Sequence, residues 1–321
     1  MRKATKIWIA TATAFVALGL IMFTVVMAKC NWDFSKLVTS KYETNTYEIT
    51  DEFDSISMNT DTADIRFAPS DNEECKVVCY EEEKVKHSVA VKEDTLVINA
   101  VNSKAWYEYI GINFSSPKIT VYLPKAKYNS LIIREDTGDV EIPEAFTFGD
   151  IDIALSTGAV DCFAFAAEKI SIKTSTGNVC VENVSAKALD ISVSTGKVTV
   201  LGVTCEGEVS VGVSTGKASL ADVKCKNLVS SGDTGDVFLK NVIASERFSV
   251  NRTTGDVKLD GCDAAELFIE TDTGDVYGTL LSEKVFITKT DTGSINVPKS
   301  VTGGRCEIAT DTGNIRITVE N

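Results

Sequence analysis

The sequence predicts an all-β protein built mainly as a single-stranded parallel β-solenoid, or β-helix, preceded by one transmembrane helix. Three observations predict this fold class: a dipeptide that recurs with a nearly fixed period, alternating apolar residues around each copy, and an uncharged apolar segment near the N-terminus. Self-similarity at such a period is typical of stacked identical units. We expect about ten coils of 19–20 residues, and a right-handed coil from the general chirality of parallel connections.

The dipeptide Thr-Gly recurs ten times at spacings of 19 or 20 residues, from Thr137 to Thr312. The residue before each of these threonines is Asp, Ser or Thr, whose side-chain oxygen can accept a nearby backbone N–H and close a turn. Glycine suits a backbone position with positive φ. We therefore expect ten structural turns, whose glycines are Gly138, Gly158, Gly177, Gly196, Gly216, Gly235, Gly255, Gly274, Gly293 and Gly313.

Apolar residues alternate with polar ones on both sides of each turn. The position six residues before the Thr is apolar in all ten copies, and the position three residues after it is Val, Ile or Ala. This period of two indicates strands with one buried face. A unit of this size cannot bury its own apolar face, so we expect successive coils to pair in parallel at about 4.8 Å.

The repeats define the domain boundaries. Residues 131–321 contain the coils, and we expect residues 44–130 to form a β-rich N-terminal cap that covers the first of them. Within the cap, Thr62-Ala63 resembles a degenerate turn with Ala in place of Gly. At the other end, Ile315 to Val319 has no visible cap, which makes this C-terminal solenoid edge a candidate for self-association.

The N-terminus carries a membrane signal. Residues 7–28 are uncharged and mainly apolar, which is long enough to span a bilayer. The basic stub of residues 1–6 predicts a cytoplasmic N-terminus, with residues 29–43 as a linker and the bulk of the chain extracellular. We favour a single-pass anchor in the cell membrane, because the apolar core is long for a signal peptide. The alternative is secretion after signal cleavage at Val26-Met27-Ala28.

Charge and cysteine usage limit the partners. The net charge of -14 lacks the basic footprint of a protein that binds nucleic acid, so we expect no nucleic-acid partner. The nine cysteines are not spaced as a dense disulfide framework. Cys205 and Cys225 occupy the same place in successive coils, where they could bond to each other or only stack.

The motifs argue against catalysis. Asp-Thr-Gly occurs five times, but aspartic proteases need two such loops facing each other across a cleft, and here they are interchangeable with Ser-Thr-Gly along one edge. The only histidine, His87, lies in a charged run that we interpret as a solvated strand face. No phosphate loop, dinucleotide fingerprint or zinc pattern is present. We expect neither an enzyme nor a cofactor.

Two sets of residues are candidates for binding. The densest aromatic run offers Trp106, Tyr107 and Tyr109 as a contact patch for a protein or glycan, unless the run packs as a long cap loop onto the solenoid edge. The second set is acidic and could bridge calcium as a weak alternative to a solvated ladder, because like charges about 4.8 Å apart repel. Its members are Asp233, Asp236, Asp256, Asp272 and Asp275.

The chain resembles a known family over about residues 48–320. The resemblance is carried by Phe53-Asp54-Ser55-Ile56, the strand Thr95 to Ile98, the strand Val121 to Pro124, and the serial Thr-Gly coils. On these features the chain is similar to the bacterial β-strand-repeat family of putative adhesins, a domain of unknown function related to the head domains of autotransporter-adhesin-like proteins. The resemblance implies a β-solenoid on an envelope protein.

We therefore expect a non-catalytic cell-envelope protein that presents an extracellular β-solenoid for adhesion, binding or scaffolding. Its partner would be an unidentified envelope or extracellular protein or glycan. Two alternatives stay open: a polysaccharide-active β-helix enzyme that uses outer carboxylates, and an envelope sensor or regulatory partner protein.

Overall fold

The computed structural model describes residues 3–33, 40–106 and 115–320. The chain divides into two units. One unit contains residues 1–43, 81–86 and 102–115, and the other contains residues 44–80, 87–101 and 116–321.

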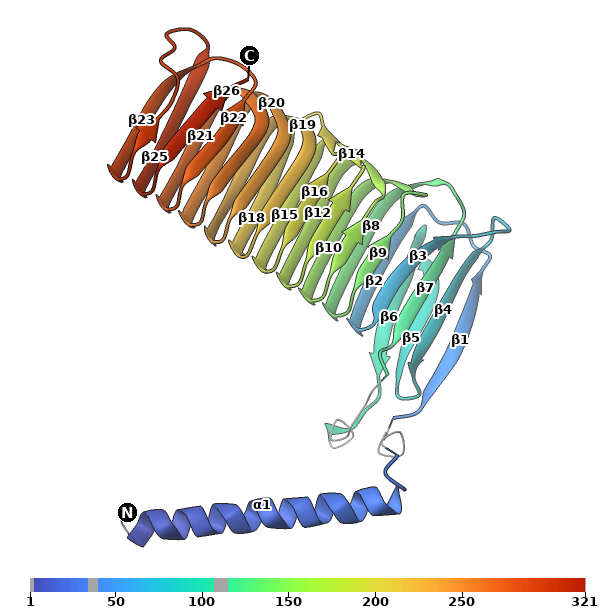
Figure 1. Ribbon diagram of the computed structural model, residues 1–321. Helices are drawn as coiled ribbons and strands as arrows, with labels where there is room; N and C mark the ends of the chain where they lie inside the picture. The colour runs from blue at the N-terminus through green and yellow to red at the C-terminus, as the bar shows by residue number, and fades with distance from the viewer. Residues whose placement is uncertain (1–2, 34–39, 107–114, 321) are drawn as a thin grey trace. The chain divides into compact units, whose positions relative to one another are not determined.

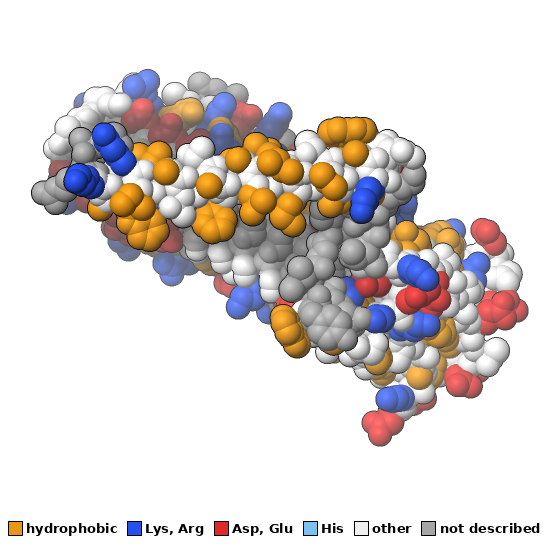
Figure 2. Space-filling model, turned by 90° about the horizontal axis from the view of Figure 1, so that it is seen from below, with side chains coloured by type: hydrophobic (Ala, Val, Ile, Leu, Met, Phe, Trp, Pro, Cys, Tyr) orange, Lys and Arg blue, Asp and Glu red, His pale blue; other side chains and the backbone are white. Residues whose placement is uncertain are grey.

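The first unit contains the only helix of the described chain, α1 (Lys3–Lys29). Its 27 residues include no acidic side chain in the first turn and Lys29 in the last. Figure 2 shows apolar side chains along its length, with basic side chains near its ends. By length and composition α1 can cross a membrane, which fits either an anchor or a signal sequence.

The rest of the described chain is almost entirely strand (Figure 1). The strands that begin before the first Thr-Gly turn are β1 (Tyr42–Ile49), β2 (Ser55–Thr62), β3 (Asp64–Pro69), β4 (Cys75–Glu82), β5 (Val85–Lys92), β6 (Thr95–Asn102), β7 (Lys118–Leu123) and β8 (Lys127–Thr137). The following strands are β9 (Val140–Ile142), β10 (Thr147–Thr157), β11 (Val160–Cys162), β12 (Phe165–Thr176), β13 (Val179–Glu182), β14 (Ser185–Ala186), β15 (Ala188–Thr195), β16 (Val198–Leu201), β17 (Thr204–Cys205), β18 (Glu208–Thr215), β19 (Ala218–Thr234), β20 (Val237–Thr254), β21 (Val257–Thr273), β22 (Val276–Leu280), β23 (Lys284–Thr292), β24 (Ile295–Asn296), β25 (Gly304–Thr312) and β26 (Ile315–Val319).

Most strands of the second unit stack in parallel, with the repeat in register; the exception is β4, which pairs antiparallel with β5 and β7. Thr157 of β10 lies between Thr137 of β8 and Thr176 of β12. At every Thr-Gly corner except that of Gly293, in the outermost coil, the glycine N–H donates to the threonine carbonyl of the adjacent coil, as Gly158 N does to Thr176 O at 2.9 Å. This arrangement confirms the predicted β-solenoid of about ten turns.

The corner glycines have no room for a side chain. Gly216 has a φ of 136°, and a Cβ built on it would lie 1.8 Å from the carbonyl oxygen of Gly196 in the preceding coil. The other Thr-Gly corners have the same positive φ, so the stack repeats one backbone conformation that only glycine adopts without strain.

Parallel stacking starts earlier than the first Thr-Gly pair. β2 pairs with β8 so that Thr62 is opposite Thr137, and Ala63 N donates to Thr137 O at 3.1 Å. The prediction of a degenerate turn at Thr62-Ala63 is therefore confirmed. β6 pairs in parallel with β2, and β7 pairs in parallel with β3.

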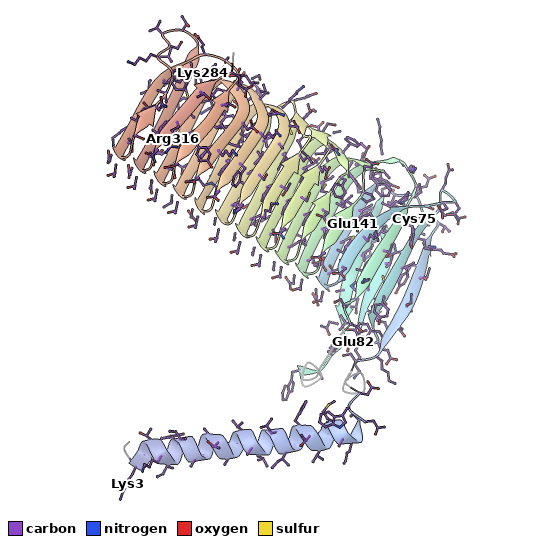
Figure 3. The ribbon with its side chains drawn as sticks, viewed as in Figure 1. Lys3, Cys75, Glu82, Glu141, Lys284 and Arg316 are labelled. Carbon is purple, nitrogen blue, oxygen red and sulfur yellow. The ribbon has the colours of Figure 1, made fainter. Side chains whose placement is uncertain are left out.

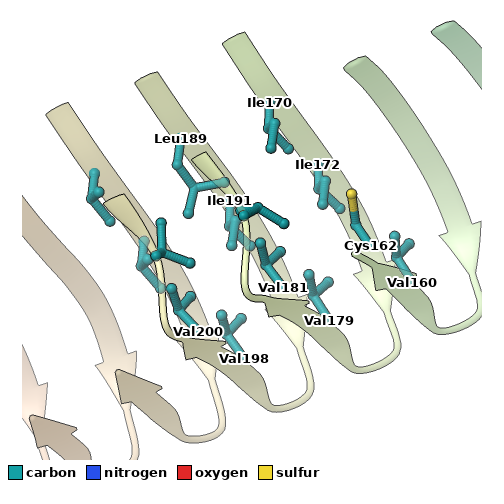
Figure 4. Packing of buried hydrophobic residues seen from close by; sticks show 14 of the residues in the cluster. Val160, Cys162, Ile170, Ile172, Val179, Val181, Leu189, Ile191, Val198 and Val200 are labelled. Carbon is teal, nitrogen blue, oxygen red and sulfur yellow. The ribbon is translucent and has the colours of Figure 1, made fainter. Parts of the chain in front are cut away.

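The core lies between the walls of the coils. Figure 4 shows the layers formed by Val160, Cys162, Ile170 and Ile172 and their counterparts in the next coils. All four are at most 1% exposed, and burial raises the pKa of Cys162 to about 12, so this thiol serves as a small neutral apolar side chain. All nine cysteines are unbonded.

The C-terminal end of the stack does not follow the order of the sequence. β25 lies between β21 and β23, and β26 lies between β22 and β24, so the last coil of the chain is inserted beneath the coil that precedes it (Figure 1). The expectation that Ile315 to Val319 forms the open edge is wrong at Ile315 and Arg316, which pair with β24 as well as with β22, whereas Ile317 to Val319 pair with β22 alone. The outermost strands are β23 and β24.

An ion pair ties this outermost coil to the body of the solenoid. Lys284 Nζ lies 2.6 Å from Asp263 Oδ1, and the lysine side chain is only 4% exposed. Ser282 Oγ donates to the same carboxylate oxygen at 2.8 Å. Lys284 itself pairs with Gly304 of β25, so the contact to Asp263 of β21 reaches across the inserted coil. Figure 3 marks Lys284 at this end of the solenoid.

Candidate functional site

The acidic row at the solenoid corners binds backbone groups of the next coil. Asp236 Oδ1 accepts the Asp256 N–H at 3.2 Å, Asp256 Oδ1 accepts the Asp275 N–H at 2.8 Å, and Asp275 Oδ1 accepts the Asn314 N–H at 2.7 Å. The sequence predicts another role for the residue before each Thr, such as Asp136: its side chain would accept a nearby backbone N–H and close the turn. That prediction is wrong, because within the described chain those side chains accept no backbone N–H. The residue two after the Thr accepts one from the neighbouring coil and so links the coils.

The geometry of the five candidate aspartates gives calcium no ready cage. Among the described residues, no three of them place ligand oxygens within 4.8 Å of one another. Asp236 lies instead 3.5 Å from Lys217 Nζ. The calcium hypothesis therefore stays a prediction for all five aspartates. Three of them, Asp236, Asp256 and Asp275, form the row of hydrogen bonds described above, and the carboxylates of Asp233 and Asp272 lie outside that row.

The aromatic run is only partly described. Trp106 is 78% exposed and belongs to the unit that contains α1. Tyr107 and Tyr109 lie outside the described residues. A contact patch at this run therefore stays a prediction.

The only histidine is buried. His87 on β5 is 3% exposed, so its interpretation as part of a solvated face is wrong. The alternation of β5 gives the reason: Val89 and Val91, two and four residues on, pack against the core, and His87 shares their face.

A groove that the sequence did not reveal lies in the second unit. It has a volume of about 940 Å³ and is bounded by the segment after β1, the segment between β3 and β4, and the segment between β7 and β8. Its lining residues are Glu48 to Phe53, Ser70 to Lys76, Tyr122, Pro124, and Ala126 to Tyr128.

The floor of the groove is aromatic and fixed in place. Phe53 and Tyr128 stack with ring centroids 6.0 Å apart, and the Tyr128 ring lies 5.6 Å from that of Phe148 behind it. Tyr128 Oη donates to the Pro124 carbonyl at 2.9 Å, so the buried hydroxyl has its partner. These contacts hold the aromatic rings at the base of the groove in fixed positions.

The rim of the groove is acidic. Its lining includes six carboxylates and two lysines; these are Glu48, Asp51, Glu52, Asp71, Glu73 and Glu74, with Lys76 and Lys127. The loop that carries half of the carboxylates is held by its own side chains: Ser70 Oγ donates to Asn72 Oδ1 at 2.9 Å, and Asn72 Nδ2 donates to Glu74 Oε2 at 2.6 Å. Clustered charge of one sign at a concave surface attracts ligands of the opposite sign.

The one thiol among the residues that line the groove is a poor nucleophile. Cys75 is 6% exposed, and burial raises its pKa to about 12 (Figure 3). It is therefore a neutral thiol at physiological pH, whereas nucleophilic attack requires the thiolate. No histidine is among the lining residues that could act as its base.

These features define a class of protein: a parallel β-solenoid of Thr-Gly coils with a strand-rich N-terminal end that carries the groove. The chain belongs to the Toastrack DUF4097 family, whose model matches residues 53–211 and 204–321. The resemblance to an adhesin-like domain of unknown function is thereby confirmed. No curated protein matches the sequence.

Several solved structures are similar to this chain at low sequence identity. A putative adhesin from Bacteroides fragilis is 17% identical, with a TM-score of 0.42 over 87% of this chain and 97% of its own. A putative adhesin from Parabacteroides merdae is 12% identical, with a TM-score of 0.46 over 88% and 98% of the two chains. A putative lipid-binding protein from Parabacteroides distasonis is 15% identical, with a TM-score of 0.34 over 88% and 98%.

Proposed function

We propose that this protein is a non-catalytic binding protein of the cell envelope, held in the membrane by α1, with its solenoid outside the cell. Its ligand is a lysine- or arginine-bearing segment of an envelope or extracellular protein, taken up in the acidic groove. The observation that carries the proposal is the ring of six carboxylates around a rigid aromatic floor.

The ligand class follows from the two surfaces of the groove. The rim favours a cation, and the floor favours an apolar side chain beside it. Lys76 Nζ already lies 4.6 Å from the centre of the Tyr122 ring, so that ring is occupied, and the rim carboxylates are left to meet the ligand's charge. An amphipathic basic segment satisfies both surfaces, whereas a neutral glycan would satisfy only the floor.

Binding can be tested with the full chain in nanodiscs of zwitterionic lipid. The probe is a fluorescent peptide of alternating Lys and Leu, and the comparison probe replaces Lys by Glu. We expect only the basic peptide to bind, and to bind more weakly as salt rises. The double variant Asp51→Asn/Glu52→Gln should weaken binding by about five- to tenfold.

A matched control removes two carboxylates elsewhere on the solenoid, in the double variant Glu206→Gln/Glu246→Gln. These residues lie outside the groove, so the affinity should stay unchanged. Equal loss in both double variants would mean that only net charge matters. Equal binding by wild type and the groove variant would exclude the groove as the site.

The location is tested separately. Intact cells treated with protease should lose the solenoid, and membrane-extracted protein should retain α1 in its intact mass. A mature chain that begins after Ala28 and is released into the medium would establish the secreted alternative.

One observation favours a second candidate, the polysaccharide-active enzyme. Asp161 and Glu141 are opposite each other in successive coils, and burial, followed by the neighbouring charges of Glu141 and Asp139, raises the pKa of Asp161. Two neighbouring carboxyl groups, one of them with a raised pKa, are the kind of groups that glycoside hydrolysis uses. Release of reducing ends from envelope polysaccharide that is lost in Asp161→Asn would establish this function in place of the binding role.

A further inference from the structure

The outermost coil of the solenoid presents an incompletely covered strand. β23 pairs with β25 on one side, from Lys284 opposite Gly304 to Thr292 opposite Thr312, and no other described strand pairs with it. An open strand edge offers unpaired N–H and C=O groups to another strand.

Apolar side chains accompany this edge. Phe286 points inward but is only partly buried, whereas Cys306 and Leu267, at the same position in the next two coils, are fully buried. On the outer face Val285 and Ile287 are 37% and 49% exposed, and Ile295 of β24 is 44% exposed. The end of the solenoid is thus an apolar layer with one side uncovered.

We propose that a second copy of this chain covers this edge, with the two β23 strands paired antiparallel about a two-fold axis at Phe286. The occupant follows from the sequence of the strand itself. When two copies of a strand pair antiparallel about a two-fold axis, outward-facing side chains must lie opposite outward-facing ones. This holds only in registers in which the numbers of two opposed residues add up to an even value. With the axis at Phe286, Val285 faces Ile287 of the partner subunit, and Lys289 faces Glu283 of the partner subunit, each twice. Within one chain Glu283, directly before β23, accepts Ser300 Oγ and Thr302 Oγ1, and Lys289 lies 3.2 Å from Asp291, so the pair between subunits adds a partner to each charge.

The neighbouring registers are less complementary. An axis at Ile287 places Glu283 opposite a second carboxylate, Asp291. An axis at Thr288 places Val285 opposite Asp291 and Ile287 opposite Lys289. Cross-strand apolar pairs and opposite charges stabilise an antiparallel pair, and like charges directly opposite destabilise it. The axis at Phe286 is the register among these that joins apolar to apolar and acid to base.

The test is the mass of the full chain in density-matched detergent, measured by sedimentation velocity over a range of protein concentrations. Wild type should sediment at twice the mass of one chain. Ile287→Lys should raise the dimer dissociation constant by about tenfold or more, because it removes both apolar pairs and adds like charges at the axis.

The solenoid supplies a matched control. Ile132 occupies the same position of the repeat as Ile287, five residues before the Thr, and is 37% exposed, but its strand β8 lies between β2 and β10. Ile132→Lys should leave the dimer intact. A loss of the dimer in Ile132→Lys as well would show that the apolar edge is not the interface.

A charge exchange identifies the register. Lys289→Glu alone and Glu283→Lys alone should each weaken the dimer, and the double variant Lys289→Glu/Glu283→Lys should restore it. A monomeric wild type, a dimer that Ile287→Lys leaves unchanged, or a double variant that stays as weak as the single variants would overturn the proposal. These outcomes are independent of what the acidic groove binds, because the groove and β23 share no residue.

Discussion

Arg252 fills the space that the absent side chain of Gly232 leaves inside the solenoid. The two residues are opposite each other in β20 and β19, and Arg252 is 1% exposed. Its Nη1 donates to the carbonyl of Val213 at 2.8 Å, one coil beyond Gly232. A Cβ on Gly232 would lie 1.8 Å from that nitrogen and 1.8 Å from the Val213 oxygen. The core thus accommodates the charged side chain of Arg252 because the opposite position in the neighbouring coil is a glycine.

Gly232→Ala should destabilise the protein by about 2–3 kcal/mol, because the new methyl group collides with both the guanidinium and the backbone. The measurement is urea denaturation followed by circular dichroism. Gly212→Ala is the control: its Cβ would meet nothing closer than 3.7 Å, so its free energy of unfolding should change by less than about 0.5 kcal/mol. Similar losses in the two variants would contradict the packing described for Arg252.

Glu135 should make the stability fall as pH rises. This carboxyl is buried next to the Thr62-Ala63 turn, and its Oε1 accepts the Ala63 N–H at 2.7 Å. Burial raises its pKa from 4.5 to about 8. The folded state therefore binds more protons than the unfolded state between these values, so the contribution of Glu135 is fully present below about pH 4.5 and is lost as pH approaches and passes about 8.

The matching experiment compares the pH dependence of the unfolding free energy in wild type and Glu135→Gln. The glutamine keeps an acceptor for the Ala63 N–H and cannot ionise, so the variant should lack a decline that amounts to a few kcal/mol across this interval. Glu141→Gln alters an exposed carboxylate that pairs with Arg66, and this variant should keep the wild-type profile. An unchanged profile in Glu135→Gln would assign the decline to other groups.

The corner ladder should depend on the oxygen of Asp256 and not on its charge. Asp256→Asn keeps an acceptor for the Asp275 N–H and reduces repulsion along the row, so its stability should equal or exceed that of wild type. Asp256→Ala leaves that N–H without its partner and should cost about 1 kcal/mol. Denaturation with and without calcium checks both points. A calcium-dependent stabilisation that Asp256→Asn abolishes would instead identify the row as a metal site.

Removal of the Lys284 side chain should loosen the end of the stack. Lys284→Ala leaves the partly buried Asp263 carboxylate without its ammonium partner, and we expect a loss of about 2 kcal/mol, less than for a fully buried pair. Lys258→Ala, on the exposed face of β21, should be nearly neutral. Hydrogen exchange of β23 and β25 should accelerate in the first variant and not in the second.

The sequence predicts the coils well because each coil is encoded locally. The apolar positions around each Thr-Gly pair determine which side chains face inward. The glycine of the pair adopts a positive φ and so determines where the chain turns. The insertion of β25 and β26 beneath β23 and β24 could not be predicted in this way. All coils carry nearly the same pattern, so the pattern does not specify which coil becomes the neighbour of which.

The groove and the buried arginine differ in how far the sequence could reveal them. Gly232 and Arg252 stand two residues before their threonines, where Val193, Val213 and Thr271 stand in other coils, so both departures could be read from the aligned repeats. The groove combines three segments that are far apart in the chain. Only the pairing of the strands between those segments brings their carboxylates to one rim.

The inserted final coil has a consequence for how the chain is completed during synthesis. Repeats that stack in sequence order can dock as they leave the ribosome, each on the one before it. Residues 284–296 cannot, because their neighbour in the folded protein, residues 304–319, is translated after them. This end of the solenoid therefore closes only after residues 304–319 have been made, and a ribosome that stops before them releases a chain in which residues 284–296 have no partner.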